Sequence, residues 1–128
     1  MRQIRHFDFN LVEIDMTRKY DIVYMFGYNT RQTMTLHNAL PLIKKQLDGG
    51  KDVAIVLIHD AVIGSSAKGK TPDQLLDLMQ TKAKIHVMEP DLKARGIDGT
   101  DLAGGTELTR YDGLVDILVG SDKIISWM

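Results

Sequence analysis

Residues 84–97 read KIHVMEPDLKARGI, a short apolar run that leads directly into an acidic turn and a segment ending at Gly96. The run predicts a strand, and the acidic residues and the closing glycine predict a short helix after it. A strand that feeds a helix gathers unpaired backbone N–H groups at one point, where proteins commonly hold an anion or a reactive thiolate. This chain contains no cysteine, so that point carries no thiolate.

The remaining segments repeat the alternation of strand and helix. Apolar runs at residues 21–28 and 52–60 predict two strands that are buried on both faces, and residues 123–127 predict a last strand. Helices are predicted from apolar spacing at residues 36–47, 71–79 and 109–120. The pattern predicts a three-layer α/β/α fold of flavodoxin- or Rossmann-like topology, with a mostly parallel sheet and helices on both faces. Residues 98–106 are glycine-rich and polar, which predicts a loop or a short ordered lid.

Length and charge narrow the class of protein. The chain has 128 residues, which suits a single domain with one core. In residues 1–19 apolar residues alternate, which predicts an extended arm or an added strand, packed on this domain or on a neighbouring subunit. The formal net charge is −1, so we expect no direct nucleic-acid binding and no attraction to a membrane surface. No apolar run approaches the ~20 residues of a membrane span, and no signal-peptide layout is present, so we expect a cytoplasmic protein.

Three of the predicted strands end at the edge where parallel α/β sheets bind ligands, and most of the residues at these ends are polar. The candidate binding residues are Asn29, Thr30, His59, Asp60, Met88 and Glu89. Because the carboxyl ends of parallel strands meet at one edge, we expect these residues to line one pocket around the start of the helix after Met88. The sequence predicts no catalytic residue, no metal ligand set and no cofactor.

Residues 64–71, GSSAKGKT, satisfy the P-loop pattern letter for letter. In a P-loop the lysine and threonine lie at the start of the helix and meet phosphate and Mg²⁺. Here Pro72 follows Thr71, and the α conformation is disfavoured for a residue before proline. We therefore interpret Thr71 as the cap of a helix that has Pro72 at its first position, and the preceding residues as a surface loop.

Histidine chemistry is a further candidate. The four histidines lie on separate segments with no metal-ligand spacing. His59 and His86 end neighbouring predicted strands, so one hypothesis brings them together, with Asp60 or Glu89, as a metal site. The alternative hypothesis makes each histidine a hydrogen-bonded packing residue.

Three segments have counterparts in one protein family. DVAIVLIHDAV, residues 52–62, is similar to a buried second strand and the turn after it, and KIHVMEPDLKARGI is similar to a third strand with its helix. YDGLVDILVGSDKIISW, residues 111–127, is similar to a closing helix and strand. Together they resemble the DsrE/DsrF/DsrH superfamily of sulfur-relay proteins, and the last resembles its DsrH/TusB branch. The resemblance implies the same three-layer α/β sheet.

The resemblance also implies small oligomers, trimers or hexamers, whose subunits pass persulfide sulfur between cysteines. In the DsrE and TusD branches it implies an active cysteine at the end of the third strand. Counting back from Gly96 places the matching position at or beside Met88. A thioether cannot become a thiolate or carry a persulfide, so that role does not transfer to this chain.

Three functional hypotheses result. The first is a non-catalytic, structural or partner-binding subunit of intracellular sulfur trafficking, in tRNA thiolation or sulfur oxidation, which assembles with itself or with cysteine-bearing DsrE/DsrF-like carriers. The second is a homo-oligomer of the same fold that binds a small molecule or an anion. The third is a phosphate- or metal-dependent enzyme. The lack of cysteine argues only against cysteine-based sulfurtransferase activity, so the question of enzyme activity stays open.

Overall fold

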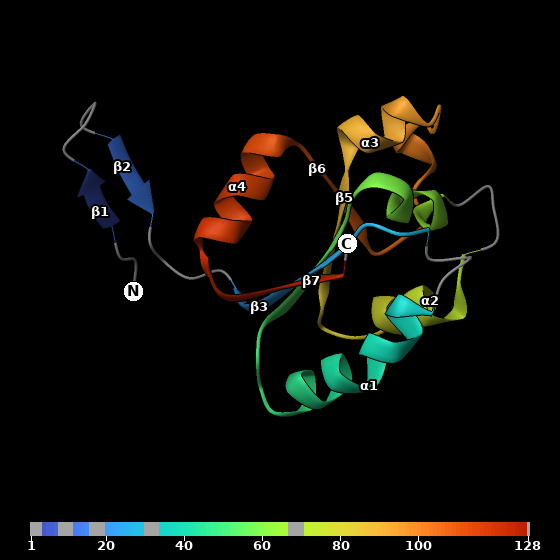
Figure 1. The fold of residues 1–128 in the computed structure, drawn as a ribbon, viewed down its shortest axis with the longest axis horizontal. Coiled ribbons are helices and arrows are strands. Elements are labelled where there is room, and N and C mark those ends of the chain that lie inside the picture. The colour runs from blue at the N-terminus through green and yellow to red at the C-terminus, as the bar shows by residue number, and fades with distance from the viewer. Residues whose placement is uncertain (1–3, 8–11, 16–19, 30–33, 67–70, 128) are drawn as a thin grey trace.

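A computed structural model gives the fold and describes residues 4–7, 12–15, 20–29, 34–66 and 71–127. Its centre is a five-stranded sheet with the strand order β6-β5-β4-β3-β7, shown in Figure 1. The strands are β3 (Tyr20–Phe26), β4 (Val53–Leu57), β5 (Lys84–Met88), β6 (Thr106–Thr109) and β7 (Ser121–Trp127). Every neighbouring pair is parallel, so the predicted α/β class is confirmed and the sheet is parallel throughout.

The strand register aligns the carboxyl ends of the central strands. Phe26 lies opposite Leu57 in the β3–β4 pair, and Leu57 lies opposite Val87 in the β4–β5 pair. All five residues of β4 are buried, as expected for a central strand that is covered on both faces. The segments that follow β3, β4 and β5 therefore leave the sheet at one edge.

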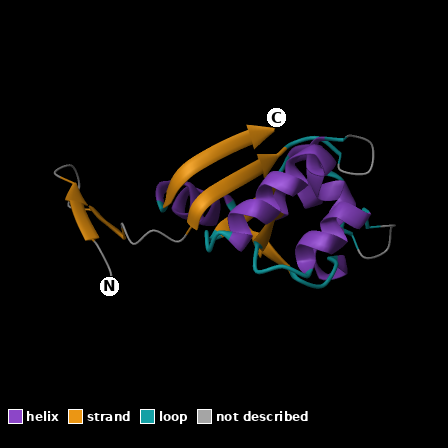
Figure 2. Cartoon of the chain, turned by 90° about the horizontal axis from the view of Figure 1, so that it is seen from below, coloured by secondary structure: helices purple, strands orange, loops and turns teal. Residues whose placement is uncertain are grey.

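Helices cover the two faces of the sheet unequally. The structure contains α1 (Thr35–Asp48), α2 (Asp73–Met79), α3 (Glu89–Ala94), α4 (Tyr111–Val119) and two 3-10 turns, η2 (His59–Ser65) and η3 (Gly99–Asp101). Buried residues of α1, α2 and α3, among them Leu36, Leu75 and Leu92, share one core cluster with the sheet. On the other face, Ile117 of α4 packs with Val23 and other strand residues. Figure 2 shows the helices around the sheet from a second direction.

Two local features differ in detail from the expectation. Residues 98–105 form the predicted loop, which contains the short turn η3, but strand β6, which begins at Thr106, was not predicted. Helix α2 begins at Asp73 with Pro72 in the capping position, one residue later than predicted, and no side chain caps it. The first N–H groups of a helix have no partner within the helix. Proline has no N–H, so its position beside the helix start is still favourable.

The N-terminal region forms a separate two-stranded sheet. Strand β1 (Ile4–Phe7) pairs antiparallel with β2 (Val12–Asp15), and neither joins the five-stranded sheet. Figures 1 and 2 both show this hairpin to one side of the α/β body. No helix in the described part of the chain has the length and apolar character needed to cross a bilayer.

Trp127 ends the edge strand β7. Its ring stacks on Phe26 of β3, with centroids 6.4 Å apart and planes inclined by 13°. The indole N–H of Trp127 is buried and has no hydrogen-bond partner in the structure. Among the residues that the structure describes, no other buried side-chain nitrogen or oxygen atom lacks a hydrogen-bond partner.

Candidate functional site

A strained turn lies at the carboxyl end of β4. Ile58 donates its N–H to the Phe26 carbonyl at 3.0 Å, and the chain then turns at His59, whose φ is 50°. Among the described residues, no other non-glycine residue has a positive φ. This left-handed conformation costs about 1–2 kcal/mol for an ordinary residue, and such strain is concentrated at functional sites. The turn is therefore the first place to look for function.

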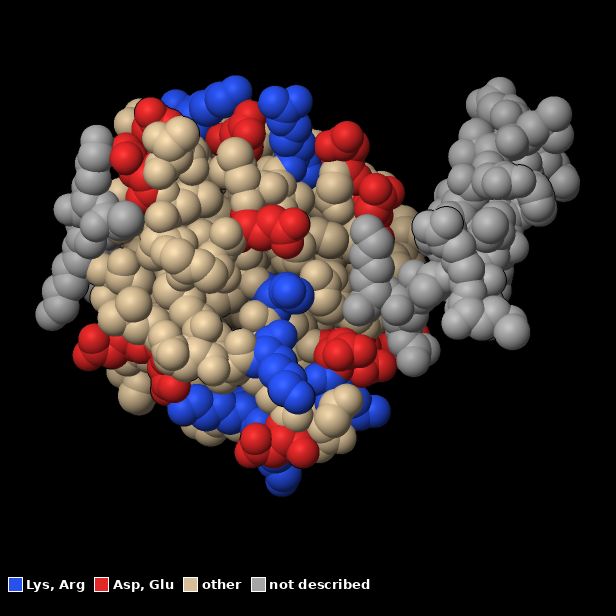
Figure 3. Space-filling view, turned by 180° about the vertical axis from the view of Figure 1, so that it is seen from behind, with Lys and Arg blue, Asp and Glu red and all other residues tan. Residues whose placement is uncertain are grey.

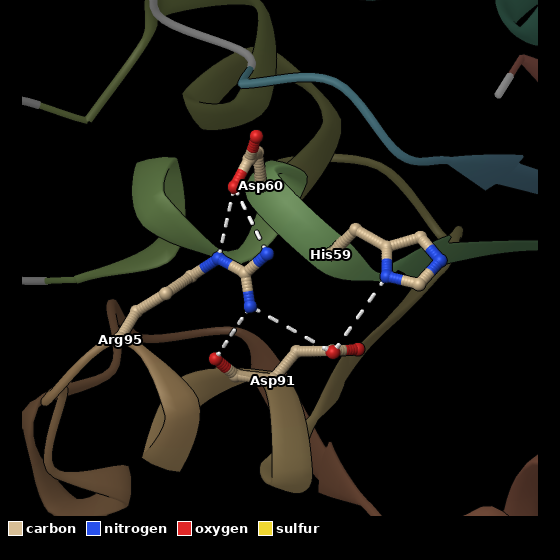
Figure 4. A network of polar contacts seen from close by, with 4 residues as sticks. All are labelled: His59, Asp60, Asp91 and Arg95. Carbon is tan, nitrogen blue, oxygen red and sulfur yellow. Dashed lines mark hydrogen bonds and ion pairs between the residues drawn. The ribbon is translucent and has the colours of Figure 1, made fainter.

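Four polar residues form a network at this turn, drawn in Figure 4. Arg95, which follows α3, donates from Nε to Asp60 Oδ1 at 3.0 Å, and its Nη2 forms an ion pair with the same oxygen at 2.9 Å. Its Nη1 donates to the Asp91 carbonyl at 3.1 Å and lies 3.8 Å from the Asp91 carboxylate. His59 Nδ1 lies 3.8 Å from the same carboxylate. The guanidinium thus links the start of η2 to the start of α3.

The charge balance of this network limits the ligands that it can accept. Two carboxylates, Asp60 and Asp91, face one guanidinium, so the network is net negative when His59 is neutral. Each of the three guanidinium nitrogens of Arg95 already contacts an oxygen of Asp60 or Asp91. The His59 and Asp60 side chains are 60% and 62% exposed and can reach a ligand. The arrangement favours a cation or a ligand rich in hydrogen-bond donors over an anion.

Met88 and Glu89 belong to a different environment. Met88 has no exposed surface and packs under α4 with Val56 and Ile117. Glu89 lies 3.0 Å from Lys93 Nζ and 3.4 Å from Arg110 Nη2. The hydrogen bond from Lys93, aided by Arg110, lowers the pKa of the Glu89 carboxyl below its ordinary value. Glu89 borders a cleft of about 470 Å³ between α3 and the start of α4.

His86 forms a second polar network, on the α4 face of the sheet. Its Nε2 lies 2.9 Å from the Tyr20 hydroxyl and its Nδ1 lies 3.1 Å from the Thr109 hydroxyl. A hydroxyl can donate or accept, so both ring nitrogens are satisfied in either neutral tautomer. Burial raises the pKa of Tyr20, and the carboxylates of Glu107 and Asp52 add to the shift. Tyr20 therefore stays protonated and available as a donor.

The predicted binding residues are thus only partly brought together. His59 and Asp60 lie side by side in one network, and Asn29 follows β3 at the same edge of the sheet. Thr30 lies outside the described residues. The side chain of Met88 points to the α4 face of the sheet, whereas that of Val87 points to the face covered by α1, α2 and α3, because side chains alternate along β5. Their role in binding stays a prediction.

His59 and His86, which one hypothesis brings together, contact different residues: His59 lies beside Asp91, and His86 lies between Tyr20 and Thr109. No group of three or more histidine, aspartate or glutamate residues in the described part of the chain is arranged to hold a metal ion. The sequence reasoning missed Asp91 and Arg95 as site residues. Their spacing of four residues along the predicted helix was the available signal.

The surface has a second cleft and a mixed distribution of charge. A cleft of about 520 Å³ lies between the carboxyl ends of α1 and α2, bordered by Lys44 and Asp77, far from the strand ends described above. Figure 3 shows basic and acidic side chains interspersed on one face of the molecule, with uncharged surface between them. No broad field of one sign is visible on that face.

Comparison with protein families and curated proteins finds two matches. Residues 31–124 match the model of a family described as DsrH-like protein. An uncharacterized protein of Methanopyrus kandleri, MK0008, is 32% identical over 96 residues, which covers 70% of this chain and 78% of that relative.

Solved structures show the same fold. The crystal structure of the YchN protein from E. coli has a TM-score of 0.69 at 21% identity and covers 88% of this chain and 100% of its own. A protein of unknown function from Methanobacterium thermoautotrophicum, MTH1491, has a TM-score of 0.64 at 16% identity, with 84% and 99% covered. At these identities the two structures support the fold alone.

Proposed function

The chain belongs to the DsrH-like family, and from this premise we propose that it is a non-catalytic subunit of intracellular sulfur trafficking that acts by binding partners. Its partners are further copies of itself, as a trimer or hexamer, or cysteine-bearing DsrE/DsrF-like sulfur carriers. The chain itself carries no persulfide, and it contributes structure or a docking surface to the assembly.

The burial of Met88 at the end of β5 is the observation that supports this proposal most directly. It occupies the end of β5, where the resemblance implies the relay cysteine of catalytic relatives. Its side chain has no exposed surface and belongs to the core under α4. A buried thioether neither ionises nor accepts sulfane sulfur, so the position supports packing rather than transfer. No cysteine elsewhere in the chain can replace it.

Native mass spectrometry tests the proposal. The chain is measured alone and after co-expression with cysteine-bearing DsrE- and DsrF-like proteins. We expect either a defined homo-oligomer or a complex of fixed stoichiometry with one of these carriers. A chain that remains monomeric in both preparations would contradict a partner-binding role.

A second function is supported by the strained turn at His59. The network of His59, Asp60, Asp91 and Arg95 lies at the strand edge where α/β folds bind ligands, and two of its side chains are mostly exposed. We propose binding of a small molecule that presents a cation or several hydrogen-bond donors, in place of an anion.

Chemical-shift mapping tests this second function. A fragment set of amines, guanidines, amides and carboxylates is titrated into the protein while the His59 imidazole and Asp60 amide signals are followed. We expect saturable shifts with amine or guanidine fragments, and their loss in Asp91→Asn. Saturation by carboxylates alone, or by no fragment, would contradict the proposal.

A further inference from the structure

A pocket of about 390 Å³ lies on the α4 face of the sheet, between α4 and the strands β5 and β6. Pockets that bind small molecules have volumes of about 300–1,000 Å³. His86 and Thr109 line the pocket although only 6% and 7% of their surfaces are exposed, and Glu107 lies at its rim with a side chain that is 68% exposed. We refer to this cavity as the His86 pocket. None of its described lining residues belongs to the network at the His59 turn.

Side-chain alternation along the strands places polar groups in this pocket. On β5, His86 and Met88 point to the α4 face, where Met88 packs beneath α4 and His86 comes two residues earlier in the strand. Tyr20 belongs to β3, and its hydroxyl reaches His86 across the intervening strand β4. Ala54 of β4 belongs to the core cluster against which Tyr20 packs, and its small side chain leaves room for this reach. The rings of Tyr20 and His86 meet edge to face, with centroids 5.8 Å apart, which fixes both rings at the pocket.

The two hydroxyl groups beside His86 have hydrogen-bonding capacity left over. Tyr20 and Thr109 contact opposite nitrogens of the imidazole. A neutral imidazole has one donor and one acceptor, so one hydroxyl donates to the ring and the other accepts from it. Each hydroxyl has one donor and two acceptor sites, and neither side chain makes a second hydrogen bond to another described residue. The pocket therefore presents hydroxyl groups that can still bind a ligand.

The charge of Glu107 selects the tautomer of His86. Glu107 Oε2 lies 3.7 Å from the Nδ1 of His86, and a carboxylate stabilises a proton on the nearer ring nitrogen. Nδ1 then donates to the Thr109 hydroxyl, and the Tyr20 hydroxyl donates to Nε2. Burial and nearby carboxylates raise the pKa of Tyr20, so its hydroxyl keeps the proton that this arrangement needs.

The charges around the pocket favour a cation. No lysine or arginine in the described part of the chain forms an ion pair with Glu107. Arg110 also lines the pocket, but its Nη2 lies 3.4 Å from Glu89. Asp112 is the second carboxylate of the lining, and it accepts from the Gly113 N–H at 2.9 Å. Two carboxylates therefore face one guanidinium that is engaged elsewhere, so an added positive charge is stabilised and an added negative charge is repelled.

We propose that the His86 pocket binds a primary ammonium group carried on a short apolar chain. An ammonium group has three donors and no acceptor, which suits a carboxylate and a hydroxyl oxygen. Thr109 Oγ1 and Glu107 Oε2 lie 3.1 and 3.7 Å from the same nitrogen of His86, so one ammonium group reaches both oxygens. Ile117 and the ring of Tyr20 also line the pocket and supply an apolar surface for the chain.

Binding of this ligand reverses the tautomer of His86. The bound ammonium neutralises Glu107 and brings a positive charge beside Nδ1, so the ring proton is favoured on Nε2. The Thr109 hydroxyl then donates to Nδ1, and the Tyr20 hydroxyl accepts from Nε2. Nδ1 gives up one proton and Nε2 takes one, so the imidazole stays neutral. The tautomer of His86 therefore reports whether the pocket is filled.

The first experiment follows the histidine side chains by nitrogen NMR, because the two neutral tautomers carry the proton on different ring nitrogens. Butylammonium, butanol and butyrate are titrated separately into the full chain near neutral pH, so that the probes share an apolar chain and differ in the head group. We expect saturable binding of butylammonium, with a dissociation constant on the order of 1 mM, and a change of His86 from the Nδ1–H to the Nε2–H form. Equal binding of all three probes, or no response of His86 to butylammonium, would overturn the inference.

The second experiment uses matched variants. Glu107→Gln removes the charge of an exposed side chain and should weaken butylammonium binding at least about tenfold. Asp116→Asn, at an exposed position of α4 outside the pocket, makes the same change in net charge and should alter the dissociation constant by less than about twofold. Thr109→Val should weaken binding, whereas Thr109→Ser keeps the hydroxyl and the binding. A Glu107→Gln or a folded Thr109→Val protein that binds butylammonium like the parent would contradict the assigned contacts.

The inference does not depend on the proposed function, and the two are tested by different signals. An amine bound at the His59 turn moves the His59 signals and loses its effect in Asp91→Asn. An amine in the His86 pocket moves the His86 signals, and we expect this response to survive Asp91→Asn. A His86 response that disappears in that variant would overturn a separate binding pocket.

Discussion

Replacing Met88 with cysteine tests whether the end of β5 is a packing site. Met88→Cys removes two carbon groups from a side chain with no exposed surface. At about 0.8 kcal/mol per group the lost transfer free energy is about 1.6 kcal/mol. The residual cavity raises the expected loss in the free energy of unfolding to about 2–3 kcal/mol. Thermal or urea unfolding measures this loss.

The same variant tests accessibility, because the new thiol is the single cysteine in the chain. A buried thiol in an apolar cluster has a raised pKa, and it reacts only when the structure opens. If opening costs at least about 3 kcal/mol, labelling by a thiol reagent slows at least about 100-fold. Ser126→Cys, on the exposed edge strand, is the near-isosteric control that labels freely.

Labelling of Met88→Cys within about tenfold of the control, in a folded protein, would refute this reasoning. It would mean that the position is open to solvent and to sulfur donors. We expect, in addition, no uptake of sulfane sulfur by Met88→Cys from a persulfide donor under native conditions.

Three further outcomes are expected. In a carboxyl NMR titration we expect Glu89 to ionise with a pKa below that of an ordinary glutamate, and Lys93→Ala to move the midpoint upward. The contribution of Glu89 to stability is therefore complete above the ordinary pKa and is lost as the pH falls through the lowered pKa. His86→Leu leaves two hydroxyl groups without their partner and lowers the free energy of unfolding by about 2–4 kcal/mol in urea melts, and a loss under about 0.5 kcal/mol would contradict the network. Gly96→Ala costs about 1 kcal/mol in thermal melts because its φ is +68°, whereas Gly104→Ala, in open space without a positive φ, costs little.

The sequence was sufficient for the parts of the fold that rest on strong local patterns. The apolar run of β4 and the left-handed glycine at Gly96 determine a buried strand and a helix end by local chemistry alone. Ile97 donates to the Leu92 carbonyl at 3.0 Å, which completes the helix end that the glycine permits. Strand β6 was missed because its sequence, Thr-Glu-Leu-Thr, is not an apolar run and the strand owes its conformation to pairing with β5.

The site was harder to predict because it depends on which helix covers which face. Alternation along β5 separates Val87 from Met88, but the pattern does not show that α4 lies over Met88 and the other helices over Val87. Asp60 and Arg95 meet because η2 and α3 pack together, a contact between segments far apart in sequence. Contacts of this kind follow from the topology of the fold and cannot be read from the spacing of residues along the sequence.

The single tryptophan of the chain gives the edge strand an optical property. Trp127 ends β7, stacks on Phe26 and holds an indole N–H without a hydrogen-bond acceptor in the structure. Indole emission is sensitive to solvent and to hydrogen bonding at this nitrogen, so the wavelength and intensity of intrinsic fluorescence report on what surrounds the end of β7. The protein therefore contains its own probe for any strand, ligand or partner that reaches this edge, and no added label is needed to follow its arrival in real time.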